Sequence, residues 1–402
     1  MQKISAAMTA FGTIALTTAL LSHATLAKDM TGVTDTEIRV GNTMPYSGPA
    51  APYGTLGKSM SAYFDTVNKA GGIAGHKIIF ISRDDSYTPP KTVEQTRKLV
   101  EEDHVAFIYA SVGTAASLSV RKYLNQNKVP QLSVLSGAST WNDPKDYPYS
   151  MSGIPSYELD GAMSAAYVLK HQPNAKIAVL YQNDDFGRDH VNGLKKRLGG
   201  KIGMIVKEAS FEVSDPTVDS QVVALQASGA DVLYMAGIPK ALARAMVKAD
   251  ELGWKPLRFI TYTASPVAAT LTLAGLERSK GVISHNNLKD PQDPQWANDP
   301  EMKGYIAWMN KDYPKPDIKN GYIFSGWSLA ASLVDILKQC NGDFSRDNVM
   351  KVFSHLHDFH PAGGLPGVVL NTTPTNYQEY SVMRDMQFDG HRWVLLPADE
   401  TM

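Results

Sequence analysis

Residues 37–85 limit the possible folds most, because they read as a complete strand–helix–strand unit. Residues 37–40, EIRV, alternate charged and apolar side chains, and residues 78–82 form the mainly apolar run of a strand covered on both faces. Between them, from about 54 to 70, apolar residues recur at helical spacing, and two glycines then supply a stop. This order favours a right-handed crossover and a parallel sheet.

The same alternation of strand and helix continues along the chain. It runs on to about residue 140, and a second series extends from Tyr157 to about Ala264. The pattern predicts an α/β fold with two doubly wound, Rossmann-like lobes. Helices are expected again at about 301–313, 322–340 and 346–356, and strands near 380–388 and 393–396.

Charge and cysteine content exclude several classes of protein. The 402 residues include 39 Lys and Arg against 40 Asp and Glu, so no overall field points to nucleic acid or to an anionic membrane. Cys340 is the only cysteine, so no internal disulfide supports the fold. The length is sufficient for two lobes, each with its own core.

Residues 1–27 have the pattern of a secretory signal. Lys3 precedes an apolar stretch from about Ala6 to Leu21, and small residues end the segment at Ala27. This order predicts cleavage after Ala27 and export from the cytoplasm. The alternative is a membrane anchor, but the apolar run is short for a hydrocarbon core of ~30 Å.

Two loops at the expected carboxyl edge of the first sheet are rich in small hydroxyl side chains. Residues 111–114, SVGT, and 136–139, SGAS, each place such side chains and free backbone N–H groups at the start of a helix. This arrangement favours a bound carboxylate without any catalytic group. Helix capping explains either loop alone equally well, but two such loops on neighbouring strands favour an anion site.

Three pieces of sequence carry a resemblance to a known family. They are the SGP and YG residues of the loop at 47–54, the sequence NKAGGIAGHKI at 68–78, and the strand that ends in Asp84 and Asp85. In this order and spacing, the chain resembles the type I periplasmic solute-binding proteins of ABC importers, specifically the branched-chain (hydrophobic) amino acid class. The likeness continues to about residue 396.

The resemblance implies a fold and a set of partners. The expected first lobe comprises residues 28–155 and 284–362, and the second comprises 156–283 and 363–402, with hinge crossings near 155, 283 and 362. The chain is expected to bind a small carboxylate between the lobes as a monomer, without a cofactor. It would then deliver this ligand to the membrane permease and ATPase of an importer.

The resemblance also implies which residues bind the ligand. In this class the loops of the first lobe hold the ligand's carboxylate, and an aromatic residue of the first loop packs on its side chain. Residues of the second lobe complete the apolar contacts. The expected ligand-binding residues are Tyr53, Ser111, Gly113, Thr114, Ser136, Gly137, Ala138, Ser139, Trp141, Phe186, Ile238, Tyr262 and Thr263.

One departure from the family pattern concerns the ligand's ammonium group. Amino acid binders of this class typically place a Glu just after the strand that here reads RFITYTA, where this chain has residues 262–264, YTA. A buried ammonium without a counter-charge is costly. An α-amino acid therefore requires that Asp84, Asp85 or Asp184 takes over, whereas an aromatic or aliphatic acid without the amine fits equally well.

Several enzyme and metal interpretations fail on spacing. Residues 57–59, GKS, imitate the end of a phosphate-binding loop, but Pro52 stands where its first Gly is required. The histidines at 355, 357 and 360 do not share a helix face and have no nearby Cys, so a solvated loop is favoured over a metal site. The acidic pairs at 84–85 and 184–185 are more typical of helix caps or of the mouth of a cleft than of acid–base catalysis.

The sequence therefore predicts a binding protein and not an enzyme. A ligand that contacts both lobes favours their closed arrangement, which is how such a protein would capture its solute. A ligand-sensing partner of a signalling receptor with the same fold remains the alternative. An enzyme on this scaffold would need turnover that depends on a nucleotide or a metal, and no motif in the sequence asks for either.

Overall fold

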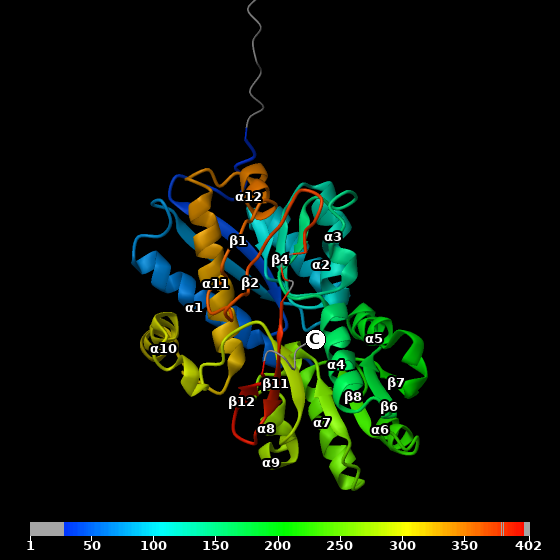
Figure 1. Cartoon of the computed structure of the whole chain (residues 1–402). Helices are drawn as coiled ribbons and strands as arrows, with labels where there is room; N and C mark the ends of the chain where they lie inside the picture. Colours follow the sequence, from blue (N-terminus) through cyan, green and yellow to red (C-terminus); the bar gives the residue numbers. More distant parts are fainter. Residues whose placement is uncertain (1–27, 379, 381, 398–402) are drawn as a thin grey trace, which may run out of the picture.

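The computed structural model describes residues 28–378, 380 and 382–397. The expected signal segment 1–27 lies outside the described residues. Within the described ranges, no helix has the length and apolar content that a membrane crossing needs. The chain folds into two α/β lobes, drawn one above the other in Figure 1.

The first lobe is built on a parallel sheet with the strand order β2-β1-β3-β4-β5. Its strands are β1 (Glu37–Met44), β2 (Lys77–Asp84), β3 (Phe107–Tyr109), β4 (Gln131–Val134) and β5 (Ser150–Ser152). The helices that follow β1, β2 and β3 are α1 (Gly54–Lys69), α2 (Pro89–Arg97) and α3 (Thr114–Gln126). β1 pairs with β2 along its whole length, which confirms the strand–helix–strand unit predicted at 37–85.

The second lobe has a mixed sheet with the strand order β12-β11-β10-β9-β8-β6-β7. Its parallel strands are β6 (Ile177–Gln182), β7 (Ile205–Phe211), β8 (Val232–Ala236), β9 (Leu257–Ile260) and β10 (Ile283–Asn286). The antiparallel strands β11 (Arg384–Phe388) and β12 (Trp393–Leu395) extend it at one edge. Its helices are α4 (Tyr157–His171), α5 (Asp185–Leu198), α6 (Asp219–Gln226), α7 (Pro239–Glu251), α8 (Leu271–Ala274) and α9 (Leu276–Ser279).

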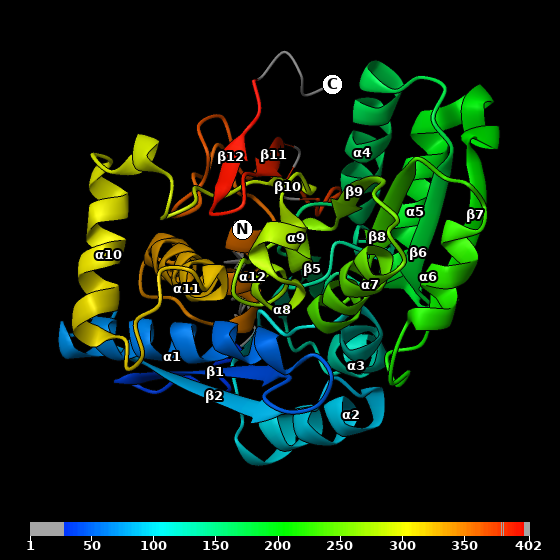
Figure 2. The ribbon, with the colours of Figure 1, turned by 90° about the horizontal axis from the view of Figure 1, so that it is seen from below.

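Three helices after β10 return to the first lobe. They are α10 (Pro300–Asp312), α11 (Gly321–Gln339) and α12 (Arg346–Phe353). Figure 2 shows α11 beside α1, and a hydrogen bond of 2.6 Å from the Ser59 hydroxyl to the Ile323 carbonyl joins the two helices. The Trp308 indole of α10 donates to the Thr66 hydroxyl of α1 at 3.1 Å.

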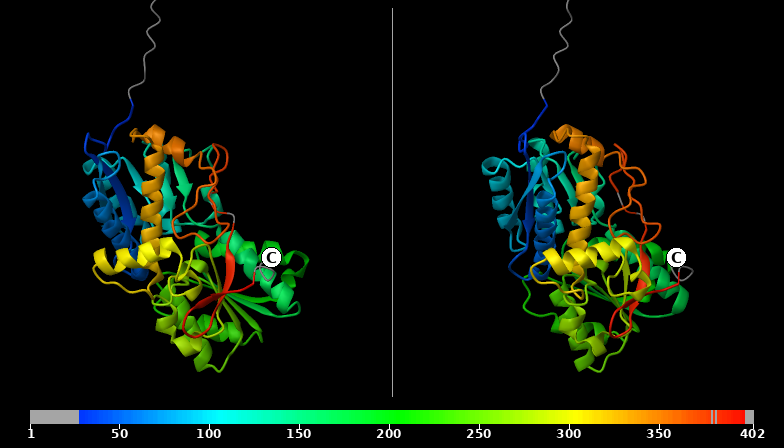
Figure 3. Two further views of the ribbon diagram at one scale, coloured as in Figure 1. Left: turned by 60° about the vertical axis from the view of Figure 1, so that its left-hand side comes forward. Right: turned by 90° about the vertical axis from the view of Figure 1, so that its left-hand side faces the viewer.

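The crossings between the lobes differ from the predicted boundaries. β10 pairs with β9 at Ile283 and with β11 from Ile283 to Asn286, so the chain leaves the second sheet after Asn286. Residues 356–378 then pack on the first lobe, where the Tyr377 hydroxyl donates to the Pro148 carbonyl at 3.0 Å. Figure 3 shows this orange and red segment running along the first lobe. The chain therefore re-enters the second sheet at Arg384, later than the crossing predicted near 362.

Candidate functional site

A cavity of about 1200 Å³, including its part open to solvent, lies between the two lobes. The first lobe and the returning helix α11 line one side of it, and the second lobe with residues 286–292 lines the other. Its walls are mainly apolar, with a small number of polar groups, which is typical of a small-molecule site. The aromatic residues of the lining are Tyr53, Tyr87, Tyr157, Phe186, Tyr262, Tyr322, Phe324, Tyr380 and Trp393.

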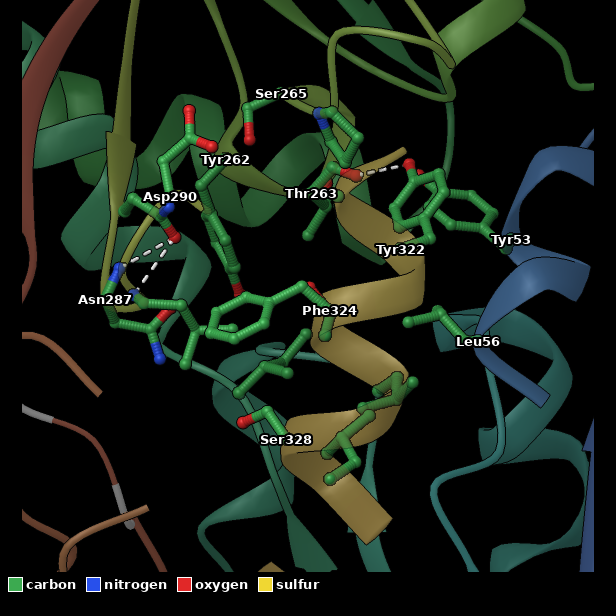
Figure 4. Close-up of a pocket in the computed structure, with 18 of the residues that line it drawn as sticks. Tyr53, Leu56, Tyr262, Thr263, Ser265, Asn287, Asp290, Tyr322, Phe324 and Ser328 are labelled. Atoms are coloured by element: carbon green, nitrogen blue, oxygen red, sulfur yellow. Dashed lines mark hydrogen bonds between the residues drawn. The ribbon is translucent and has the colours of Figure 1, made fainter. Parts of the chain in front are cut away.

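Two tyrosines of the first lobe meet at one side of the cavity (Figure 4). Tyr53 precedes α1 and Tyr322 is the second residue of α11, and their ring centroids are 5.2 Å apart. The Tyr322 hydroxyl donates to the Thr263 carbonyl at 2.8 Å, which joins the first lobe to the second. Both residues line the cavity, so this hydrogen bond between the lobes is part of the cavity wall.

Gly113 allows a third tyrosine to approach this wall. Its φ of +107° lies in the region that favours glycine, and a Cβ built there would lie 2.7 Å from the Tyr87 ring. The Tyr87 ring is stacked 6.5 Å from that of Tyr53. Any larger residue at 113 would therefore displace an aromatic face of the cavity.

The second lobe contributes a further aromatic group. Tyr157, the first residue of α4, packs edge-on against Phe186 with centroids 4.9 Å apart. The Tyr262 hydroxyl donates to the Pro155 carbonyl at 2.7 Å. Burial raises the pKa of Tyr157 to about 12 and also raises the pKa values of Tyr53 and Tyr262. These phenols are therefore neutral near pH 7 and offer hydroxyl groups without charge.

The structure brings only part of the predicted site into the cavity. Tyr53, Gly113, Phe186, Tyr262 and Thr263 line it. The remaining predicted residues are outside the lining, namely Ser111, Thr114, Ser136, Gly137, Ala138, Ser139, Trp141 and Ile238.

The predicted anion-binding loops are engaged with the protein itself. The hydroxyls of Thr114 and Ser136 are fully buried and hydrogen-bonded to each other at 2.7 Å, and the Trp141 indole donates to Ser136 at 2.8 Å. The Ser139 N–H donates to the Asp189 carboxylate of α5 at 2.7 Å. The second loop therefore contacts a carboxylate side chain of the other lobe.

The Ser111 hydroxyl has a structural partner as well, because it accepts the Thr43 N–H at 3.1 Å. The buried side chains of Ala138 and Trp141 belong to one apolar cluster, and that of Ile238 belongs to another.

The three acids considered for the ligand's ammonium are also engaged elsewhere. Asp84 accepts hydrogen bonds from Ser47 at 2.6 Å and from Lys91 at 2.8 Å. Asp85 accepts the Tyr87 N–H at 2.9 Å, and Asp184 caps α5 through the Gly187 N–H at 3.2 Å. None of these three acids lines the cavity.

Sequence reasoning missed several residues of the lining. Tyr157 and Tyr322 each stand at the start of a predicted helix, and an aromatic residue in that position beside the expected cleft was the available signal. Asp290 lies in a polar, proline-rich link that reads as a surface segment. In the structure this link folds back along the cavity.

A cluster of buried ionisable side chains lies next to the aromatic wall of the second lobe. Asp160 of α4 lies 2.5 Å from His285 Nδ1 of β10 and 3.0 Å from His190 Nδ1 of α5. His285 Nε2 is 3.3 Å from Asp385 of β11, without hydrogen-bond geometry. The His190 ring is stacked 4.5 Å from the Tyr157 ring. The cluster thus joins the cavity wall to two strands near the hinge.

Within the described ranges, no three His, Cys, Asp or Glu side chains are grouped so that they could hold a metal ion. His355 Nδ1 lies 2.7 Å from the Lys351 carbonyl, and His357 is exposed beside Asp358.

Comparison with known proteins places this geometry in a family. A family model described as periplasmic binding protein matches residues 37–390. Leu/Ile/Val-binding protein homolog 7 of Brucella abortus (strain 2308) is 20% identical over 381 residues, which cover 90% of this chain and 92% of the relative. Homolog 3 of Brucella melitensis is 25% identical over 203 residues, and the match spans 50% of this chain and 54% of that relative's length.

Solved structures share the fold at low sequence identity. A branched chain amino acid ABC transporter protein from Thermus thermophilus, with bound valine, superposes with a TM-score of 0.81 at 17% identity, covering 91% of this chain and 96% of the other. A fatty acid ABC transporter substrate-binding protein from Thermomonospora curvata has a TM-score of 0.74 at 22% identity, covering 92% and 93%. The matching family model is that of a binding protein and not of an enzyme.

Proposed function

We propose that this chain, which belongs to the periplasmic binding protein family, captures a small carboxylate with an apolar body between its lobes and delivers it to the permease and ATPase of an ABC importer. The ligand would be a branched-chain or other hydrophobic amino acid, or an aromatic acid. The observation that carries the proposal is the aromatic cavity, to which both lobes contribute side chains. The family's extracytoplasmic location agrees with this role.

Contacts between the lobes support a capture mechanism based on closure. The hydrogen bonds from Tyr322 to the Thr263 carbonyl and from the Ser139 N–H to Asp189 both run between the lobes. A ligand that packs against Tyr53 and Phe186 together would add contacts that only the closed arrangement allows. Such a ligand shifts the population toward that arrangement.

Thermal shift of residues 28–402 tests the proposed ligand class. The panel contains leucine, isoleucine, valine and phenylalanine together with benzoic, phenylacetic and cinnamic acids. A ligand present at 100 times its Kd stabilises the native protein by about 2.7 kcal/mol, which raises the midpoint by several degrees. We expect at least one of these acids to do so. A midpoint that no member of the panel changes would contradict the proposal.

The variant Tyr53→Ala tests the aromatic wall. Removal of this buried ring is expected to weaken binding of an aryl ligand by about tenfold and to weaken binding of leucine less, because ring–ring contacts add to simple burial. Calorimetric titration measures both affinities. Tyr123→Ala, on the surface of the first lobe, is the control and should leave both unchanged. An equal loss for the two ligands would remove ring stacking from the explanation.

A further inference from the structure

Asp290 is an acidic residue whose side chain lines the cavity (Figure 4). It lies in the link after β10 and is half-buried. One carboxylate oxygen accepts the Gln292 N–H at 2.9 Å. Figure 4 places Asp290 on the side of Tyr262 and Ser265, away from Tyr53 and Tyr322. Burial raises its pKa, so the charged form has lost hydration that the neighbouring groups do not fully replace.

Two of the nearby cations, Lys289 and Arg392, are paired with other carboxylates. The Lys289 ammonium donates to Asp299 at 2.9 Å and to Glu301 at 3.2 Å. Arg392 lies 3.7 Å from Asp389. Lys319, which also lines the cavity, is exposed, so solvent screens its charge. Among the residues that the structure describes, Asp290 therefore has no ion-pair partner.

Apart from Asp290, Lys289 and Lys319, the side chains that line the cavity are uncharged, and many of them are aromatic. An ammonium group is attracted both by a carboxylate and by the faces of aromatic rings. The acids that sequence reasoning considered for this role, such as Asp84 and Asp184, are hydrogen-bonded elsewhere. Position 263 follows the strand after which amino acid binders of this class typically have a Glu for the ligand's ammonium, and it is a Thr in this chain. Asp290 thus supplies a negative charge from a different segment of the chain.

We propose that Asp290 is the counter-charge for an ammonium group of the ligand and selects ligands that carry an amine beside an apolar body. This inference rests on the proposed function and narrows it. Of the two ligand types considered above, it favours the amino acid over the aromatic acid that lacks an amine. A ligand ammonium would pair with the carboxylate while its apolar part fills the aromatic cavity.

Matched ligand pairs test this inference. L-phenylalanine is compared with 3-phenylpropanoic acid, and L-leucine with 4-methylpentanoic acid, because the members of each pair differ only in the amine. Calorimetric titrations use the wild type, Asp290→Asn and the control Asp312→Asn, which removes one charge at the end of α10. Asparagine keeps an acceptor for the Gln292 N–H, so the unliganded midpoint should change little.

We expect the wild type and Asp312→Asn to bind the amine-bearing member of a pair more tightly. Asp290→Asn should weaken that binding by about 30-fold or more and leave the amine-free acid unchanged. Equal losses for both members, or no loss, would overturn the role of Asp290. If the wild type binds only amine-free acids, this inference fails while the proposed function stands. If no acid of either kind binds, both fail. If the variant does not fold, a wild type that binds both members of each pair equally tightly still overturns this inference.

Discussion

Replacing Asp160 with Asn is expected to lower the free energy of unfolding by about 3–5 kcal/mol, because it leaves a buried charge without its partner. Asp160 is fully buried and lies within 3.0 Å of both His285 and His190. Urea denaturation of the unliganded protein at pH 5.5 measures the change. The control is Asp335→Asn, which removes an exposed ion pair with Lys338 and should change stability by less than about 1 kcal/mol.

The effect of Asp160→Asn should depend on pH with a defined sign. Burial alone would raise the pKa of Asp160, but the two histidines lower it to about 2, below the ordinary 3.8. Asp160 therefore contributes stability that is present above about pH 4 and is lost as the pH falls toward 2. Burial alone would lower the pKa of His285, but Asp160 and Asp385 raise it above 6.5. The stability that protonated His285 contributes is fully present below pH 6.5 and is lost as the pH rises through the folded-state pKa of this residue.

The stabilisation by the Asp160–His285 pair is thus expected to be largest between about pH 4 and 6.5. Burial raises the pKa of Asp385 above 3.8, so the ionisation of that side chain removes some stability as the pH rises through its folded-state pKa. The difference in the free energy of unfolding between the wild type and Asp160→Asn should become smaller as the pH falls toward 2. A difference that stays constant from pH 2 to 8 would contradict the ionic account of the cluster.

Sequence patterns predicted the local structure well because local structure depends on neighbouring residues. The apolar periodicity of residues 37–85 predicted β1, α1 and β2. The loop positions of Tyr53 and Phe186 at the carboxyl edges of strands placed both beside the cavity. The residues that return from the end of the chain, such as those of α11, could be assigned to the first lobe only through the family resemblance.

The partners of the polar groups could not be predicted, because they come from distant parts of the chain. The loop at 136–139 was predicted to bind an anion, yet nothing local indicates that its partner in the structure would be the Asp189 carboxylate. Likewise, His285 and Asp160 belong to different elements that meet only in the folded lobe. The polar composition of the link around Asp290 indicates solvent, whereas the hinge geometry turns part of it toward the cavity.

Gly161→Ala is expected to be the other strongly destabilising change, because α4 and α5 are in backbone contact at this residue. A Cβ built on Gly161 would lie 2.0 Å from the His190 carbonyl oxygen and 2.8 Å from the Leu194 nitrogen. Neither atom can rotate away, so the two helices must separate. The cost of such overpacking reaches about 3 kcal/mol, which exceeds the gain of up to about 1 kcal/mol from replacing a helical glycine by alanine.

The control for Gly161→Ala is Gly304→Ala in α10, where no atom lies within 4 Å of the built Cβ. That variant should be more stable than the wild type by about 0.5–1 kcal/mol, so the two substitutions are expected to act in opposite directions in urea denaturation. Because α4 also carries Tyr157 and α5 carries Phe186, separation of these helices should weaken ligand binding as well. A Gly161→Ala variant as stable as the wild type would mean that this helix pair adjusts without displacing the aromatic wall.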